Sequence, residues 1–242
     1  NMALSGETID YGPCAFMDAY DPATVFSSID RHGRYAYGNQ PAIAQWNLAR
    51  FAETLLPLLH VEERAAIDLA KEAVANFAPL FQKQWLTGMR RKLGLLVERP
   101  EDPALIDDLL GWMQKTKADF TNTFAALAAA DGDGKMDTQQ APAMNVDDAF
   151  RAWSERWRVR LAQEESTEAS ARVRRTVNPA VIPRNHLVEE ALAAAEQEDL
   201  QPMERLLAVL AQPFAHGKHP PKFLGPAPLI AGAGPYQTYC GT

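Results

Sequence analysis

"EDPALIDDLLGWMQKTKADFTNTFAALAAA", residues 101–130, is the stretch whose pattern determines the predicted fold class. Its large apolar residues recur at steps of three and four, which is typical of one buried helix face. They are Leu105, Leu109, Trp112, Phe120, Phe124 and Leu127. Asp102 is a candidate N-cap and Pro103 suits a first helical turn, whereas Gly111 is expected to weaken the helix locally. The stretch therefore predicts helix with a buried stripe.

The same periodicity extends outward in both directions. From Pro41 the predicted stripe is Leu48, Phe51, Leu55 and Leu58 or Leu59, with Pro57 expected to bend or end that helix. A long helix is predicted from Glu62, carrying Ile67, Val74, Phe77, Phe81 and Trp85 inward and closing at "MRRKLGL", where basic residues and a glycine suit a helix C-terminus. Residues 146–165 predict another helix with Val146, Phe150, Trp153 and Trp157 on one side. Residues 186–199 and 202–214 predict a helical pair, so the expected class is mainly α.

Composition limits the possible functions. The chain has 242 residues, 47% of them hydrophobic, and a net charge of −7. This charge argues against a general nucleic-acid or anionic-membrane binder, because such binding needs a basic face. No apolar run reaches the roughly 18 residues that a membrane span requires, and the N-terminus lacks the pattern of a secretory signal. We therefore expect a cytoplasmic protein without nucleic-acid or membrane partners.

Several familiar motifs fail on inspection. In "DGDGKMD", counted from Asp131, the fifth position is Lys135 and the twelfth is Pro142, where a calcium loop needs oxygen ligands. The patterns HExxH, GxSxG and GxxxxGK[ST] do not occur. The arginines of "RVRRTVNP", residues 172–179, and nearby Arg184 could contact phosphate, although solvation or pairing with glutamate is the commoner role of such a cluster.

The opening stretch "NMALSGETIDYGP", residues 1–13, carries a possible metal site. A central glycine and partial alternation predict a tight turn and a short strand that bring Asn1 and Asp10 to one end. Amide and carboxylate oxygens are hard donors suited to Mg²⁺, and protein kinases use an Asn and a later Asp in this way. A capped turn and a strand-end Asp explain the same spacing without any metal.

A family resemblance favours the metal interpretation. "NMALSGETIDYGPCAFMDAYDPATVF", "GRYAYGNQPAIAQWNLARFAETLLPLL" and "VNPAVIPRNHLVEEALAAAEQEDLQPMERLLAVLAQPF" resemble the SelO family, also called YdiU. Its members are pseudokinases that transfer AMP from ATP to protein hydroxyls. Residues from about 90 to 165 match mainly in helical character.

The resemblance implies the C-terminal part of a protein-kinase-like fold with a short N-terminal β-hairpin. It implies that Asn1 and Asp10 hold Mg²⁺, with Mn²⁺ as the alternative ion, and that Asp10 also contacts ATP. Partners would be ATP and proteins with Ser, Thr or Tyr hydroxyls. The proton-acceptor Asp of the family would stand immediately before Asn1, so no catalytic residue is expected within this chain, and the chain alone is expected to be inactive.

The expected organisation has three parts: a metal-binding hairpin and activation-segment-like loop over 1–40, helices over 41–212, and a Pro/Gly-rich arm over 213–242. The resemblance associates Cys240 with redox control through a loop cysteine whose position Phe26 occupies here, and Cys14 could substitute for it. Two free thiols are the simpler expectation. A non-catalytic helical interaction module with a vestigial kinase-like segment, or a conventional phosphotransferase, is the alternative function.

Overall fold

The computed structural model describes residues 3, 5–7, 15–135 and 146–227, and this part of the chain is mainly helical, as predicted. Two short 3-10 helices, η1 (Tyr37–Asn39) and η2 (Pro221–Phe223), accompany the α helices. The α helices are α1 (Gln40–Leu59), α2 (Glu63–Ala75), α3 (Phe77–Leu93), α4 (Asp102–Thr116), α5 (Phe120–Ala129), α6 (Asp148–Leu161), α7 (Thr167–Val177), α8 (Asn185–Ala195) and α9 (Gln201–Leu210).

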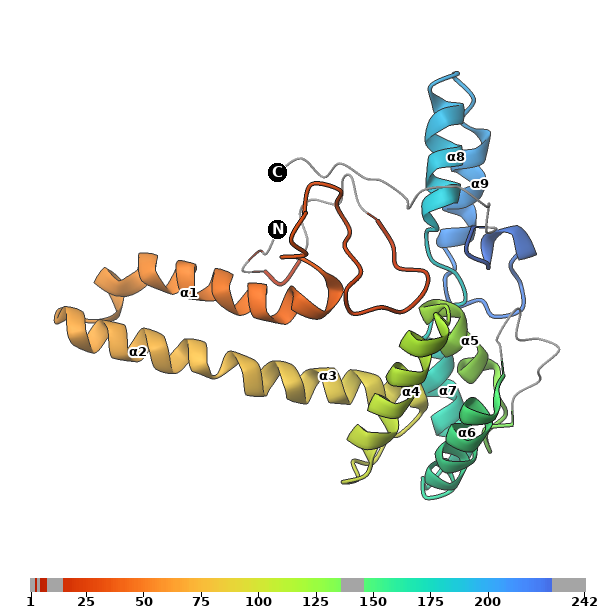
Figure 1. Ribbon diagram of the computed structural model, residues 1–242, viewed down its shortest axis with the longest axis horizontal. Coiled ribbons are helices and arrows are strands. Elements are labelled where there is room, and N and C mark those ends of the chain that lie inside the picture. Colours follow the sequence, from red (N-terminus) through yellow and green to blue (C-terminus); the bar gives the residue numbers. More distant parts are fainter. Residues whose placement is uncertain (1–2, 4, 8–14, 136–145, 228–242) are drawn as a thin grey trace.

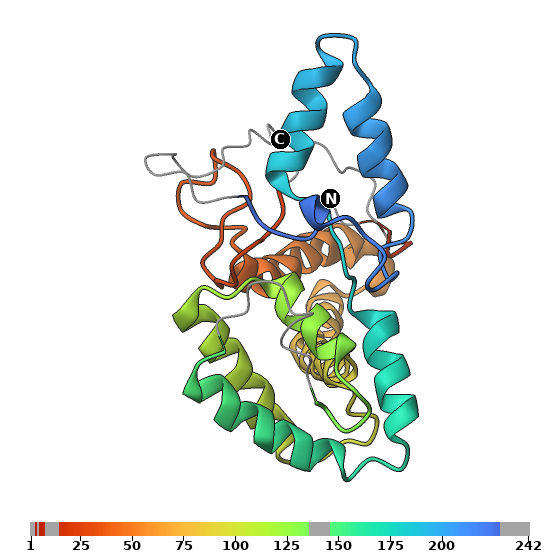
Figure 2. The same ribbon diagram turned by 90° about the vertical axis from the view of Figure 1, so that its right-hand side faces the viewer.

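The helices form an arm, a body and a separate hairpin (Figure 1). Helix α1 runs back along α2 and α3, which follow one another nearly in line and together make the long arm. Helices α4 to α7 gather around the C-terminal end of α3 to make the body, and the paired helices α8 and α9 project from it (Figures 1 and 2). The irregular segment before α1 therefore lies beside both the body and the α8–α9 hairpin.

The core of the body is where the predicted stripes meet. Leu109 on α4 and Phe150 and Trp157 on α6 belong to these stripes and are fully buried. Ile106 and Met113 on α4, which the predicted stripe does not include, are fully buried as well. Buried indoles need acceptors for their N–H groups. Backbone carbonyls are these acceptors: Trp153 Nε1 donates to the Leu105 carbonyl at 2.8 Å, and Trp157 Nε1 donates to the Leu93 carbonyl at 2.9 Å. The tryptophans thus tie α6 to α4 and to the end of α3.

Residues 101–130 form two helices because the chain turns at Lys117, which has a left-handed φ of 53°. Asp119 then caps α5 by accepting from the Asn122 amide at 2.7 Å. The prediction that Asp102 is an N-cap is wrong, since Glu101 occupies that position. The Asp102 carboxylate is instead fully buried and accepts from Arg160 Nε at 2.7 Å. It serves as an internal anion between two helices.

The arm departs from the predicted burial. Helix α1 forms as expected and runs two residues past Pro57, yet it has no buried residue. Phe51, Leu58 and Leu59 are exposed, with Leu58 at 81%. The long helix predicted from Glu62 is divided at Asn76 into α2 and α3. The helices form where they are predicted, but the stripes predicted to face inward on the arm are not buried among the described residues.

The end of α3 is fixed by a glycine. Gly94 has a φ of 76° and caps the helix, as the "MRRKLGL" pattern predicts. The Ser170 hydroxyl donates to the Gly94 carbonyl at 2.5 Å, and a Cβ added to Gly94 would lie 2.8 Å from Arg174 Nη1. Both the backbone angle and the close approach of α7 therefore require glycine here.

Candidate functional site

The irregular segment of residues 15–36, which we call the loop segment, is attached to the start of α5. A single antiparallel bridge joins Ala19 to Asp119. The Tyr20 amide donates to the Ala118 carbonyl at 2.9 Å, and the Phe120 amide donates to the Asp18 carbonyl at 2.8 Å. The Tyr20 ring is buried and stacks on Phe120. These contacts fix the course of the loop segment across the body.

Arg184 and Asn185, at the start of α8, hold the loop segment from the other side. Arg184 is fully buried, and its Nη1 donates to Asp18 Oδ1 at 2.5 Å and to Asp119 Oδ2 at 2.7 Å. The Asn185 side chain pairs with the backbone of Phe16 in both directions, each hydrogen bond measuring 2.8 Å. One buried cation therefore connects the loop segment, α5 and α8, and it pairs with two carboxylates.

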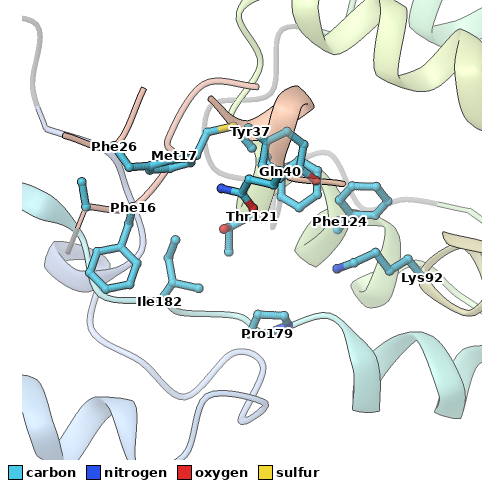
Figure 3. Close-up of a pocket in the computed structure, with 12 residues that line it drawn as sticks. Phe16, Met17, Phe26, Tyr37, Gln40, Lys92, Thr121, Phe124, Pro179 and Ile182 are labelled. Carbon is cyan, nitrogen blue, oxygen red and sulfur yellow. The ribbon is translucent and has the colours of Figure 1, made fainter. Parts of the chain in front are cut away.

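A pocket of about 430 Å³ lies between the loop segment and the body (Figure 3). Its walls come from the loop segment, η1, the start of α1, the last turn of α3, the first turns of α5 and the connection from α7 to α8. The residues that line it are mainly apolar: Ala15, Phe16, Met17, Phe26, Tyr37, Gln40, Lys92, Phe120, Thr121, Phe124, Pro179 and Ile182.

Lys92 is the cation of this pocket. Burial lowers its pKa to about 8, because an apolar surrounding disfavours the charged form. Its Nζ donates to Asn178 Oδ1 at 3.2 Å and lies 4.8 Å from the centre of the Phe124 ring. The Asn178 amide in turn donates to the Lys92 carbonyl at 2.8 Å, which fixes the position of both side chains.

The predicted metal ligands Asn1 and Asp10 lie outside the described residues, as do Cys14 and Cys240. Between Asn1 and Asp10 in the sequence, Gly6 has a φ of 77° and its amide donates to the Ala3 carbonyl at 3.0 Å. A turn therefore occurs at the glycine, as predicted. Phe26, the position matched to a loop cysteine, lines the pocket. Among the residues that the structure describes, no group of three or more His, Cys, Asp or Glu side chains could hold a metal, and no helix could cross a membrane.

Sequence reasoning missed the positions that organise this region. Lys92 was considered only as a cation at a helix end, and Arg184 as part of a possible phosphate cluster. The structure buries both Arg184 and Arg174, and Arg174 donates to the carbonyls of Leu127, Ala130 and Asp131. One available signal was that Arg184 follows the mainly apolar, proline-containing stretch "VNPAVIP".

Comparison with known proteins identifies the class of the chain. The family model described as "Protein adenylyltransferase SelO" matches residues 1–211, so the chain belongs to the SelO family. It is 58% identical to "Protein nucleotidyltransferase YdiU" of Halalkalibacterium halodurans, and 54% and 52% identical to proteins of the same name from Alkaliphilus metalliredigens and Bacillus cytotoxicus. Each match covers 100% of this chain and 48% of the relative. The chain thus spans about half the length of these relatives.

Proposed function

We propose that this chain is the C-terminal portion of a protein adenylyltransferase, which transfers AMP from ATP to Ser, Thr or Tyr hydroxyls of other proteins. Membership of the SelO family over residues 1–211, which include Asn1 and Asp10, is the observation that carries the proposal. Because ATP is the substrate, we also propose that the protein acts in the bacterial cytoplasm.

The proposed site uses two oxygen donors. The Asn1 amide oxygen and the Asp10 carboxylate would hold Mg²⁺, or Mn²⁺ in its place, and Asp10 would also lie at the nucleotide. This donor set suits a hard cation that keeps part of its water shell. The bound cation would neutralise charge on the triphosphate. The contribution of the chain is to fix the two oxygens on one turn, and the turn at Gly6 supports that role.

We further propose that the helices are the C-terminal part of a protein-kinase-like fold. Residues 1–40 would form the metal-binding hairpin and activation-segment-like loop, 41–212 the helical lobe, and 213–242 an arm. The irregular course of the loop segment before α1 and the end of α9 at Leu210 support these boundaries.

The test uses the intact protein with ATP labelled separately at the α- and γ-phosphates. Label should enter target protein from the α position, only with Mg²⁺ or Mn²⁺ present, and be lost in Asn1→Ala and Asp10→Ala. Asp108→Ala, which removes an exposed carboxylate of α4, is the matched control and should keep full activity. Label from the γ position would indicate a phosphotransferase. Incorporation from neither position would favour a non-catalytic interaction module.

A further inference from the structure

The pocket between the loop segment and the body has the size and walls of a small-molecule site. Sites for small organic ligands usually measure about 300–1,000 Å³ and combine apolar walls with a few polar groups. This pocket has about 430 Å³, aromatic and aliphatic walls, and the polar side chains of Gln40, Lys92 and Thr121 (Figure 3).

Lys92 is the one charged side chain among the described residues that line the pocket. Lys92 Nζ has one neutral acceptor, Asn178 Oδ1, and two aromatic rings around it, those of Phe120 and Phe124. An ammonium group has three donors. Among the described residues, no carboxylate forms an ion pair with Lys92, so at least one donor is available to a ligand at the pocket wall.

Neighbouring elements bring few competing charges to Lys92. Helix α5 contains no ionisable residue. On α7, Arg174 is turned toward backbone carbonyls, and the carboxylates of Asp18 and Asp119 are bound to Arg184. The ammonium of Lys92 therefore has no carboxylate partner among the described residues, and the ligand group that matches it best is an anion that enters with an apolar body.

We propose that this pocket binds a small monocarboxylate with an apolar body, such as a medium-chain fatty acid, with its carboxylate on Lys92 Nζ and its apolar part against Phe16, Phe26 and Ile182. A single carboxylate matches the single cation. The apolar body matches walls that would leave a polar ligand with unsatisfied groups. The site is independent of the proposed transfer of AMP.

The ligand would contact three segments at once. The loop segment contributes Phe16 and Phe26, α3 contributes Lys92, and the connection before α8 contributes Ile182. Because all three lie against one occupant, binding should reduce opening of the loop segment, which hydrogen exchange can detect.

The proposal is tested by calorimetric titration of the intact protein with decanoate, decanol and butyrate. Decanoate should bind at one site, and decanol and butyrate should bind at least about tenfold more weakly, because each lacks one half of the recognised ligand. Binding of decanol as tight as that of decanoate, or failure of decanoate to bind, would overturn the proposal. Decanoate will also fail to bind if another segment of the intact protein already fills the pocket.

Substitutions of Lys92 test whether its ammonium group binds the carboxylate of decanoate. Lys92→Gln should weaken decanoate at least about tenfold, whereas Lys92→Arg should keep most of the affinity. Lys83→Gln removes an exposed lysine of the same helix and should change nothing. Unchanged binding in a folded Lys92→Gln variant would contradict the assignment.

The unmodified protein provides a test that needs no folded variant. Since the pKa of Lys92 is about 8, decanoate affinity should be nearly constant from pH 6 to 7. It should then fall by up to about tenfold per pH unit above 8, because binding must restore the ammonium proton. In Lys92→Arg the affinity for decanoate should stay constant over the same pH range. A flat profile in the unmodified protein would refute the role of Lys92.

Discussion

Replacement of Arg184 by Met should release the loop segment from the body. The guanidinium donates to Asp18 Oδ1 at 2.5 Å, to Asp119 Oδ2 and Oδ1 at 2.7 and 3.1 Å, to Asn122 Oδ1 at 3.2 Å and to the Leu224 carbonyl at 2.9 Å. Removing one partner of a buried charge pair costs about 3–5 kcal/mol. The remaining side chains of Asp18 and Asp119 are 27% and 13% exposed and can recover some hydration, which favours the lower limit.

We therefore expect Arg184→Met to lower the free energy of unfolding by about 3 kcal/mol, or the melting temperature by roughly 6–12 °C. Urea unfolding followed by tryptophan fluorescence measures the loss, and amide exchange over residues 15–36 should accelerate most. Arg156→Met is the control, because its pair with Asp108 is exposed at 56% and 53% and should contribute little. Equal losses from the two variants, or unchanged exchange in the loop segment, would refute the reasoning.

Three further perturbations test separate features of the body. Gly94→Ala should destabilise the protein by at least about 1–2 kcal/mol in thermal unfolding, because the alanine must adopt a left-handed φ and its Cβ collides with α7. Gly88→Ala is the control: Gly88 lies within α3 with open space around it, so this variant should be slightly more stable. Trp157→Phe should cost about 1–3 kcal/mol in urea unfolding, because it leaves the buried Leu93 carbonyl without its donor. Lys92 has a folded-state pKa of about 8, below the unfolded value, so its contribution to stability should rise between pH 8 and about 10.5. Unfolding of the unmodified protein compared with Lys92→Met over that range should reveal a rise that the variant lacks.

The helices of the body were predictable because their stripes are complete within short windows. Phe150, Trp153 and Trp157 recur at steps of three and four, and all three are buried on α6 as expected. The chain reversal after α4 was not predictable, because Lys117 adopts a left-handed φ that lysine rarely favours. The amides of Lys117 and Ala118 donate back to the carbonyls of Gln114 and Met113, so the turn closes α4 locally even though its sequence lacks the glycine that usually marks such a turn.

The pocket and its supports were not predictable for a different reason. Arg184 and Asp18 are 166 residues apart, and Lys92 and Asn178 are 86 apart. A single sequence gives each of these residues the appearance of an ordinary surface charge or amide. Their roles follow only from the topology that brings the loop segment, α3, α5 and the start of α8 together. The candidate metal ligands Asn1 and Asp10 differ from these residues, because their spacing, their oxygen donors and the family resemblance indicated them from the sequence.

Helix α1 of the arm should unfold more easily than the body. Because the cooperative units of unfolding follow buried contacts, α1, which buries none of its 20 residues, belongs to the low end of a stability gradient. Its amides should exchange through local separation from α2, while those of α4 and α6 exchange only when the body unfolds. Val61, almost fully exposed in the connection between α1 and α2, lies where a protease would cut first. The folded state is therefore a hierarchy in which helix α1 can detach and return while the tryptophan core stays intact.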